Sequence, residues 1–542
     1  MSGAEFPEVT TAAGALRGRR EEGLAVFRGI PYAQPPVGEA RFAEPRPVRH
    51  WDGVREAFAF GPPPPQEPLG PDTAPADRVP AAGDDWLTVN VWTPDPDRAS
   101  GRPVLVWIYG GAYKFGSADD PAYDGSRLAR DGDLVVVTLN YRVGVEGFAR
   151  IEGAPANRGL LDQVAALEWV RENITAFGGD PDRVTVFGES AGAGSIAALM
   201  VMPRAHGLFH RAIAQSVPGT FFSEALAADI AGTIAGELGL RPTVADLSGV
   251  DPRKLPAAGA AVSARMREYV HRWGPVALTP TPFSPVVDGE VLPTTPWEAL
   301  ASGTARDIEL IVGHNRDEYR LFLVLGGLLG RVDDNLASTA LSLFGPTPDA
   351  ARAYRSAFPE ASAEYLFELV QSDWLFRMPS LHLAQAHAAG GGRAHLYELT
   401  WTAPANGGVL GACHGLDVPL TFGMYGGLGA MLIGPAPTPE TEALSARFRS
   451  AWTAFATTGD PGWPAYDTEQ RLAQLLDTAP TVAPYPEETS RRLWEHHTFA
   501  PLTLATRDGS RAPCGRAQGP RPREGTLHAR HGRSPRPPGL EP

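Results

Sequence analysis

The five residues Gly-Glu-Ser-Ala-Gly at positions 188–192 decide the fold class of this chain. The apolar run Val184–Phe187 before them predicts a buried strand, and Ala191–Met202 after them predicts a helix. Glycine on each side of a serine permits a sharp strand-to-helix turn that leaves the serine exposed. The amide dipoles of the following helix point toward the oxygen of Ser190. The stretch therefore predicts a nucleophile, although glycine-rich loops of this composition also arise by chance in long chains.

A second glycine turn, Tyr109–Ala112, follows the apolar run Val104–Ile108. Continuous apolar runs are typical of central strands in a parallel sheet that helices cover on both faces. A serine oxygen that attacks a carbonyl creates an oxyanion, and free backbone N–H groups in a nearby turn can bind that charge. The order strand, glycine turn, strand and serine turn predicts an α/β-hydrolase with an oxyanion hole. An ordinary turn is the alternative for the glycine pair.

Further motifs follow one another over most of the chain: Phe27–Pro36, Asn90–Pro94, Asn140–Gly144, Gly159–Gln163 and Ala176–Pro181. With the two glycine turns they resemble the type-B carboxylesterase family, which includes bacterial p-nitrobenzyl esterases and the cholinesterases. The resemblance extends from about Gly14 to Trp494. It implies an α/β fold of the α/β-hydrolase class, with a central, mostly parallel sheet flanked by helices and with helical cap insertions.

The resemblance implies a catalytic triad in the chain order serine, acid, histidine. The family's acid is a glutamate that ends a G-x-x-x-D-E segment, which is Glu318 here, and Asp317 directly before it is the rival. The family's histidine opens an H-G-x-D/E segment, which is His414 here. Glu318 follows the apolar residues Leu310–Val312. We therefore expect it at the carboxyl end of a strand, where open α/β sheets have their sites.

These three residues would divide the work of ester hydrolysis. A serine hydroxyl hardly ionises near neutral pH, so His414 would take the proton of Ser190 during attack and pass it to the departing alcohol. Glu318 would hold the imidazole in the required tautomer and stabilise the imidazolium. Water would then attack the acyl-serine. No metal and no organic cofactor is expected.

The resemblance also implies roles for residues around the triad. The backbone amides of Gly111, Ala112 and Ala191 would form the oxyanion hole. Ser216 matches a serine that family members carry close to the triad, and a plain serine at a strand end is the alternative. For Glu189, inside the serine turn, structural hydrogen bonding is the expected role.

Several positions depart from the family pattern. Trp86 stands where most relatives have the first cysteine of a disulfide, and the only cysteines are Cys413 and Cys514. We therefore expect free thiols and a reducing compartment. Residues 77–83 lack the tryptophan that binds choline in cholinesterases, which makes choline esters poor candidates. Tyr319 replaces the usual glycine after the acid and leaves the shape of that loop open.

Residues 1–500 are expected to form a single catalytic domain, because the motifs of one site are spread over most of that length. Residues 501–542 are rich in arginine, proline and glycine and predict a disordered tail, with binding of an anionic partner as the alternative. Residues 62–83 predict a proline-rich lid loop. Three stretches predict cap helices: Ala225–Leu240, Leu321–Phe344 and Ala363–Ala389. The resemblance implies two structural ion pairs, Arg41 with Asp84 and Arg142 with Asp162.

The composition suits a globular enzyme, since 43% of the 542 residues are hydrophobic. A formal net charge of −14 argues against binding of nucleic acid, which needs a basic face. No apolar run is long enough to span a membrane, and the first residues lack an export signal, so a cytoplasmic protein is expected. A small-molecule ester is the expected partner. The oligomeric state is open, with a monomer favoured.

The sequence thus predicts a serine carboxylesterase that works through an acyl-serine intermediate. One alternative keeps the triad but cleaves amides, carbamates or lactones, because nucleophile, base and oxyanion hole are common to these reactions. The other is a non-catalytic adhesion or scaffold member of the same superfamily. Those relatives typically lose a triad residue, whereas Ser190, Glu318 and His414 are all present here.

Overall fold

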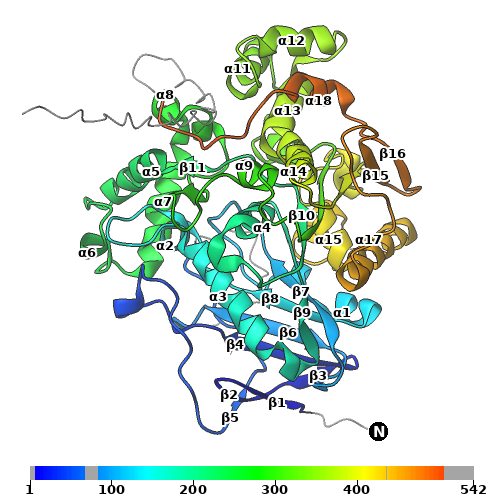
Figure 1. Ribbon diagram of the computed structural model, residues 1–542. Coiled ribbons are helices and arrows are strands. Elements are labelled where there is room, and N and C mark those ends of the chain that lie inside the picture. Colours follow the sequence, from blue (N-terminus) through cyan, green and yellow to red (C-terminus); the bar gives the residue numbers. More distant parts are fainter. Residues whose placement is uncertain (1–5, 67–82, 435, 506–542) are drawn as a thin grey trace, which may run out of the picture. The chain divides into compact units, whose positions relative to one another are not determined.

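The computed structural model describes residues 6–66, 83–434 and 436–505. Its largest element is an 11-stranded sheet (Figure 1). In sheet order the strands are β16 (Thr481–Pro484), β15 (Leu472–Leu476), β14 (Ala394–Leu399), β13 (Glu309–Asn315), β10 (Arg211–Gln215), β9 (Gly179–Glu189), β7 (Arg102–Ile108), β8 (Val135–Leu139), β6 (Thr88–Thr93), β4 (Leu24–Pro31) and β3 (Arg19–Glu21). Neighbours from β15 to β8 run parallel, and strands at both margins pair antiparallel. The prediction of a central, mostly parallel sheet is confirmed.

Two groups of helices cover the sheet. In the first group, α3 (Arg158–Asn173), α4 (Ala191–Val201) and α14 (Met378–Ala389) pack against β9, β10 and β13, and α9 (Pro296–Ala301) packs on α4 and α14. In the second group, α17 (Pro439–Thr458) packs against β7 and β9, α1 (Ser126–Gly132) packs against β6, β8 and α17, and α15 (Asp417–Phe422) packs on α17. In Figure 1 the parallel strands run between the two groups.

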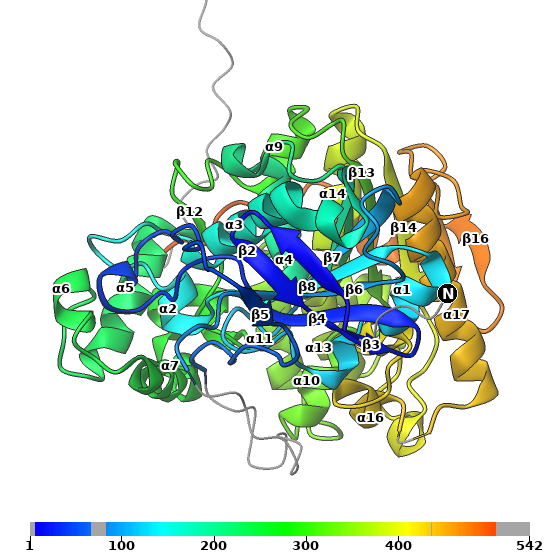
Figure 2. The ribbon, with the colours of Figure 1, turned by 90° about the horizontal axis from the view of Figure 1, so that it is seen from below.

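Other elements surround these layers. A small sheet of β1 (Glu8–Thr11), β2 (Gly14–Arg17) and β5 (Val54–Glu56) lies on the side from which Figure 2 is seen. A two-stranded sheet pairs β11 (Phe222–Ser223) with β12 (Val286–Val287). The further helices are α2 (Gly144–Phe148), α5 (Glu224–Gly236), α6 (Val244–Leu247), α7 (Leu255–Ala264), α8 (Val270–Trp273), α10 (Arg320–Leu325), α11 (Asp334–Phe344), α12 (Ala350–Ala357), α13 (Ala363–Ser372), α16 (Leu428–Leu432) and α18 (Glu488–Trp494).

The central strands are buried on both faces, which explains why their sequences are apolar without alternation. All side chains of β8 and nearly all of β7 are buried. Each valine or leucine there contributes about 1.5–3 kcal/mol of burial free energy. Trp107 of β7 packs against Phe187 of β9, with ring centroids 4.8 Å apart, and against Phe422 of α15 at 5.0 Å. This aromatic contact ties the segment that carries His414 to the end of the sheet that carries Ser190.

The three predicted cap stretches are helical, with two interruptions. The first corresponds to α5. The second divides into α10 and α11 because glycines with positive φ, Gly327 at +65° and Gly330 at +72°, lie between them. The third contains a five-residue π-helix, η8 (Asp373–Arg377), between α13 and α14. A π-helix widens the turn by one residue per hydrogen bond, which local sequence patterns do not indicate.

One of the two predicted ion pairs is confirmed and the other is wrong. Arg142 Nη2 and Asp162 Oδ1 lie 2.8 Å apart, and both side chains are fully buried. Arg41 instead pairs with Glu146 of α2 at 2.7 Å, because its buried guanidinium needs a buried carboxylate. Asp84 lies at the surface, and its partner is Arg253 at 3.4 Å.

Three predictions concern segments that fall partly outside the described residues. The lid loop at residues 62–83 is described only to Gln66 and from Gly83, and the tail at residues 501–542 only to Ala505. Cys514 lies outside the described residues, whereas Cys413 is a buried free thiol. The domain boundary at residue 500 therefore stays a prediction. In the described part of the chain, no helix combines the length and apolar character that a membrane crossing requires.

Candidate active site

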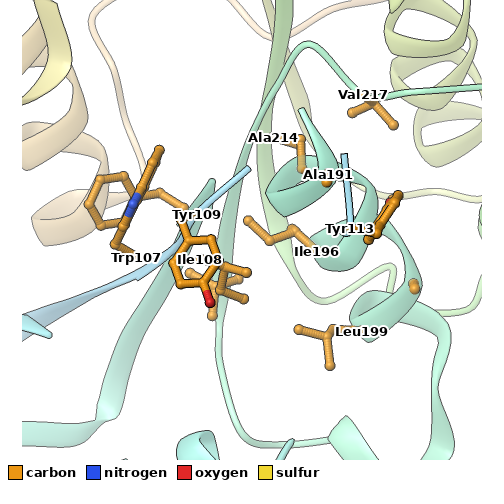
Figure 3. Close-up of a cluster of buried hydrophobic side chains, with 14 of the residues drawn as sticks. Trp107, Ile108, Tyr109, Tyr113, Ala191, Ile196, Leu199, Ala214 and Val217 are labelled. Carbon is orange, nitrogen blue, oxygen red and sulfur yellow. The ribbon is translucent and has the colours of Figure 1, made fainter. Parts of the chain in front are cut away.

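Ser190 stands at the tip of the turn between β9 and α4. Its backbone has φ +55° and ψ −122°, a conformation that non-glycine residues rarely adopt. A Cβ atom at position 188 would lie 2.5 Å from the carbonyl oxygen of Ile108, and one at position 192 would collide with the same oxygen. Glycine at both positions therefore lets α4 pack directly on the end of β7. Figure 3 shows buried side chains of this region, among them Ile108 of β7 and Ala191 and Ile196 of α4.

A chain of short hydrogen bonds leads from Ser190 to His414 and Glu318. His414 Nε2 lies 2.9 Å from Ser190 Oγ, and His414 Nδ1 lies 2.6 Å from Glu318 Oε2. Glu318 follows β13, and His414 stands shortly before α15. Their backbones also meet, because the N–H of His414 donates to the carbonyl of Glu318 at 3.3 Å. The structure thus brings together the three residues that the sequence singled out, although they are widely separated along the chain.

The second carboxylate oxygen of Glu318 is also held. Ser216 Oγ donates to Oε1 at 2.5 Å, and the backbone N–H of Asn315 donates to the same oxygen at 2.8 Å. The Glu318 side chain is fully buried. Ser216 therefore lies directly behind the acid, as the resemblance implied. These donors hold the carboxylate in place and fix its orientation toward His414.

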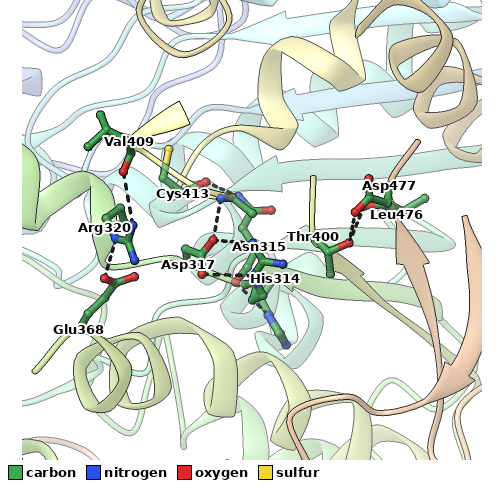
Figure 4. A network of polar contacts seen from close by, with 12 residues as sticks. His314, Asn315, Asp317, Arg320, Glu368, Thr400, Val409, Cys413, Leu476 and Asp477 are labelled. Atoms are coloured by element: carbon green, nitrogen blue, oxygen red, sulfur yellow. Dashed lines mark hydrogen bonds and ion pairs between the residues drawn. The ribbon is translucent and has the colours of Figure 1, made fainter. Parts of the chain in front are cut away.

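Asp317, the rival acid, points to other partners. Its Oδ2 accepts the backbone N–H of Ala412 at 2.8 Å, and its two oxygens accept from the guanidinium of Arg316 at 3.0 and 3.2 Å. Figure 4 shows Asp317 in this network, together with Asn315 and Cys413. Tyr319 has φ −77° and ψ −8°, values open to any residue, so the absent glycine does not distort this loop.

The glycine turn after β7 lies against the serine turn. A Cβ atom at Gly110 would lie 2.8 Å from the carbonyl oxygen of Glu189 and 3.2 Å from Ser190 Cβ, so only glycine fits this approach. Gly111 and Ala112 have positive φ values of +107° and +55°. Among the residues that the structure describes, no hydrogen bond uses the amide N–H of Gly111 or Ala112. Ala191 is the first residue of α4, where an N–H has no partner within the helix.

Glu189 lies beside the imidazole of His414. Its Oε1 is buried, forms no hydrogen bond within the described residues, and lies 3.1 Å from His414 Nε2 as an ion-pair contact. The structural hydrogen bonding expected of Glu189 stays a prediction, and its contact with His414 was not part of that expectation. Burial raises the pKa of Glu189 to about 8, with Asp417 and Glu318 adding to the rise and His414 opposing it.

The carboxylates around His414 favour its charged form. Burial alone would lower the pKa of the imidazole, but Glu189 and Glu318 outweigh burial and raise it to about 9. Asp417, fully buried in α15, contributes in the same direction and accepts a hydrogen bond from Tyr397 at 2.8 Å. An imidazolium that forms when Ser190 loses its proton would therefore be strongly stabilised at this position.

Comparison with known proteins identifies the family. A model of the carboxylesterase family matches residues 5–494. The chain belongs to the carboxylesterase family. This carboxylesterase is a carboxylic ester hydrolase of the serine type, as predicted.

Two curated relatives cover most of the carboxylesterase. It is 38% identical over 498 residues to the para-nitrobenzyl esterase of Bacillus subtilis (strain 168), covering 89% of this chain and 97% of that protein. It is 36% identical over 471 residues to the phenmedipham hydrolase of Pseudarthrobacter oxydans, covering 85% of this chain and 93% of that protein.

Solved structures agree with this assignment. A crystal structure of a Geobacillus stearothermophilus carboxylesterase at pH 6.2 matches 90% of this chain and 99% of its own, with a TM-score of 0.78 and 38% identity. A structure titled thermophilic PNB esterase matches with a TM-score of 0.79 and 36% identity. The α/β-hydrolase fold predicted for this carboxylesterase is confirmed.

Sequence reasoning missed the aromatic side chains that surround His414. Phe376 of η8 and Phe322 of α10 both contact the imidazole of this carboxylesterase. Neither residue belongs to a motif quoted above, and both lie in stretches predicted only as cap helices. The one available signal was the density of phenylalanine and leucine directly after Glu318, which indicates an apolar wall but not its target.

Proposed function

We propose that this carboxylesterase hydrolyses its esters through an acyl intermediate on Ser190, with His414 as the general base and Glu318 as the acid that orients it. The observation that carries the proposal is the unbroken chain of hydrogen bonds from Ser190 Oγ through the imidazole to the buried Glu318. Ser216 and the Asn315 amide hold the other oxygen of Glu318, so the imidazole has one preferred orientation.

Acylation begins when Ser190 Oγ attacks the ester carbonyl. The hydroxyl proton passes to His414 Nε2, the C=O π electrons move onto the oxygen, and a tetrahedral oxyanion forms. The C–O bond to the alcohol then breaks, and the alcohol oxygen takes the proton from Nε2. Throughout these steps Glu318 stays ionised and accepts the Nδ1 proton as a hydrogen bond.

The amides of Gly111, Ala112 and Ala191 bind the oxyanion in this proposal. Two observations support it: within the described residues the N–H groups of Gly111 and Ala112 donate no hydrogen bond, and Ala191 lies at the N-terminus of α4. One such donor is typically worth about 3–4 kcal/mol of barrier height. Because the contact is made by backbone N–H groups, alanine at position 112 can supply it as glycine would.

Deacylation repeats the same chemistry with water. A water molecule gives a proton to His414 Nε2 and attacks the acyl carbon, and collapse of the second tetrahedral intermediate returns the proton to Ser190 Oγ. The carboxylic acid leaves, and the enzyme is restored. Glu189, 3.1 Å from Nε2, stabilises the imidazolium in both halves of the cycle when it is ionised, above its raised pKa of about 8.

The proposal is tested by turnover of p-nitrophenyl acetate and butyrate in wild type and Ser190→Ala, with mass spectrometry after treatment with a fluorophosphonate. The variant should lose on the order of 10⁵-fold or more in kcat, because the covalent route is gone. The fluorophosphonate should add to Ser190 alone, with loss of fluoride. Ser342→Ala, at an exposed position of α11, is the matched control. Full turnover by the Ser190 variant would contradict the proposal.

Preference for esters over amides or carbamates belongs to the proposal as well. The relatives named above are a para-nitrobenzyl esterase and a phenmedipham hydrolase, so similar sites act on different compounds. Rates on an ester and an amide with the same acyl group would measure the preference directly. Cytoplasmic location and a monomeric state remain predictions of the sequence.

A further inference from the structure

The π-helix η8 brings an aromatic ring onto the face of His414. Phe376 lies in this segment and is 3% exposed. Its ring centroid is 4.0 Å from that of the imidazole, with 27° between the planes, which is a stacked arrangement. Few ring pairs in the described chain approach so closely. Because π-helical turns are rare and often occur at functional sites, the position of Phe376 calls for a functional explanation.

A second ring completes an aromatic layer beside the imidazole. Phe322 of α10 lies 5.4 Å from His414 at 40°, and 6.1 Å from Phe376 at 13°. Phe322 is partly exposed, whereas Phe376 is enclosed. The nearer, enclosed ring of Phe376 is therefore the one that restricts the imidazole directly, and Phe322 packs beside both rings.

The π-helix itself is firmly anchored. Arg377 Nη2 donates to Glu487 Oε2 at 2.5 Å and Nη1 donates to the carbonyl of Arg316 at 3.3 Å. Asp373 accepts the hydroxyl of Tyr354 at 2.7 Å. These contacts join η8 to the segment before α18 and to the loop that carries Glu318. They hold the wide turn in place and leave the Phe376 ring little freedom to withdraw from the imidazole.

The surroundings of His414 divide into an anionic part and an aromatic part. The charged groups that face it are Glu318 from the loop after β13, Glu189 from β9 and Asp417 from α15. The rings of Phe376 and Phe322 come from η8 and α10. The π face of an aromatic ring carries partial negative charge, so it attracts a cation placed over it. Both parts therefore favour an imidazolium over a neutral imidazole.

We propose that Phe376 is a positioning residue for the reaction: it stacks on His414, holds the imidazole in line with Ser190 Oγ and Glu318, and stabilises the imidazolium formed in each half of the cycle. The inference rests on the proposed function of His414 as the base. A histidine ring has a broad preference about its outer torsion, so its alignment with Ser190 depends on neighbours that block rotation. Phe376 blocks it on one face.

The test compares Phe376→Leu, which removes the ring, with Phe376→Tyr, which keeps it. Phe177→Leu is the matched control, because Phe177 is fully buried and packs edge-on against Phe27 at 5.1 Å, away from His414. Each protein is assayed with p-nitrophenyl, phenyl and ethyl esters of one acid, and kcat/KM is measured against pH. Thermal unfolding of each variant records the loss of packing separately.

Loss of the ring should lower kcat by about 10-fold for every leaving group and change KM little, because misalignment of the base affects all alcohols alike. The acid limb of kcat/KM should move to lower pH by about half a unit, since the imidazolium loses its aromatic partner and the neutral base is reached earlier. Phe376→Tyr should stay close to wild type. Phe177→Leu should lower the unfolding temperature without moving the limb.

Two results would overturn the inference: a loss confined to KM and dependent on the alcohol, or a kcat and limb equal to wild type. Either would make Phe376 a wall of the substrate pocket. If the leucine variant does not fold, Phe376→Met takes its place with the same expectations. Labelling of Ser190 in the wild-type protein by the fluorophosphonate tests the proposed function separately from the role of Phe376. If Ser190 is not labelled, the proposed triad is contradicted, whatever the Phe376 variants show.

Discussion

The serine turn and the histidine loop meet at one hydrogen bond but are held in different ways. The serine turn depends on backbone: two glycines let α4 touch the end of β7, and the φ value of +55° at Ser190 follows from that contact. The histidine depends on side chains from several elements, among them Glu318, Glu189 and Phe376. A backbone contact either fits or collides, whereas side-chain partners can be removed one at a time. The two regions should therefore respond differently to substitution.

The largest effect is expected where the backbone has no room. In Gly192→Ala the new methyl group would collide with the carbonyl oxygen of Ile108, so α4 must shift away from β7. We expect a loss of about 3 kcal/mol or more in unfolding free energy and loss of turnover. Chemical denaturation and esterase assays measure both. Gly232→Ala in α5 is the control and should unfold no more easily, because within the described residues the added carbon would meet no atom within 4 Å apart from its neighbours and its own helix backbone. A Gly192→Ala variant that stays active and stable would show that the serine turn tolerates a backbone change as the histidine loop tolerates loss of a side chain.

The next effect separates two neighbouring carboxylates. Glu318→Gln should lower kcat by about 10⁴-fold, because the amide can present an N–H to Nδ1 and favour the wrong tautomer. Asp317→Asn should lower it by less than about 10-fold, because its partners are Ala412 and Arg316 and the cost falls on stability. Steady-state kinetics and thermal unfolding of both variants check the ranking. Equal losses of kcat would show that the histidine loop behaves as one rigid unit.

The smallest effect concerns pH. Burial lowers the pKa of His414, but the charge of Glu189, the largest opposing cause, and that of Glu318 raise it to about 9. The neutral imidazole is the base, so kcat/KM should rise with pH until His414 has lost its proton. The pKa of Glu189, about 8, lies below that of His414, about 9, so Glu189 is ionised in the pH range where His414 loses its proton. Glu189→Gln removes that negative charge beside Nε2, lowers the pKa of His414, and should move the acid limb to lower pH. The pH profile of kcat/KM measures the shift. If the acid limb of kcat/KM stays in place or moves to higher pH, Glu189 does not raise the pKa of His414.

Local features of the site could be predicted from the sequence, and those that depend on long-range register could not. The serine turn, its flanking strand and helix, and the oxyanion turn each follow from a few adjacent residues. The choice between Asp317 and Glu318 needed the family resemblance, because two neighbouring acids after a strand are equivalent in composition. Ser216 also came from the resemblance, and its contact with Glu318 depends on β10 and β13 being neighbours.

The contacts that were predicted wrongly or missed depend on burial or on helical register. Arg41 pairs with Glu146 and not Asp84 because burial, which a charge pattern does not reveal, decides which carboxylate a guanidinium meets. Phe376 reaches His414 only because η8 has the wider π-helical turn. An α-helical register over the same residues would direct that ring elsewhere. Side-chain contacts that depend on burial or on a one-residue shift of helical register cannot be predicted from the pattern of a single sequence.

The buried thiol of Cys413 can report how often the histidine loop opens. It is fully buried directly before His414, and burial together with Glu318 raises its pKa, so a thiol reagent cannot reach or activate it in the closed state. With Cys514 changed to serine, Cys413 would be the sole thiol in the chain. Its rate of modification would then report local opening around the base, separately from global unfolding.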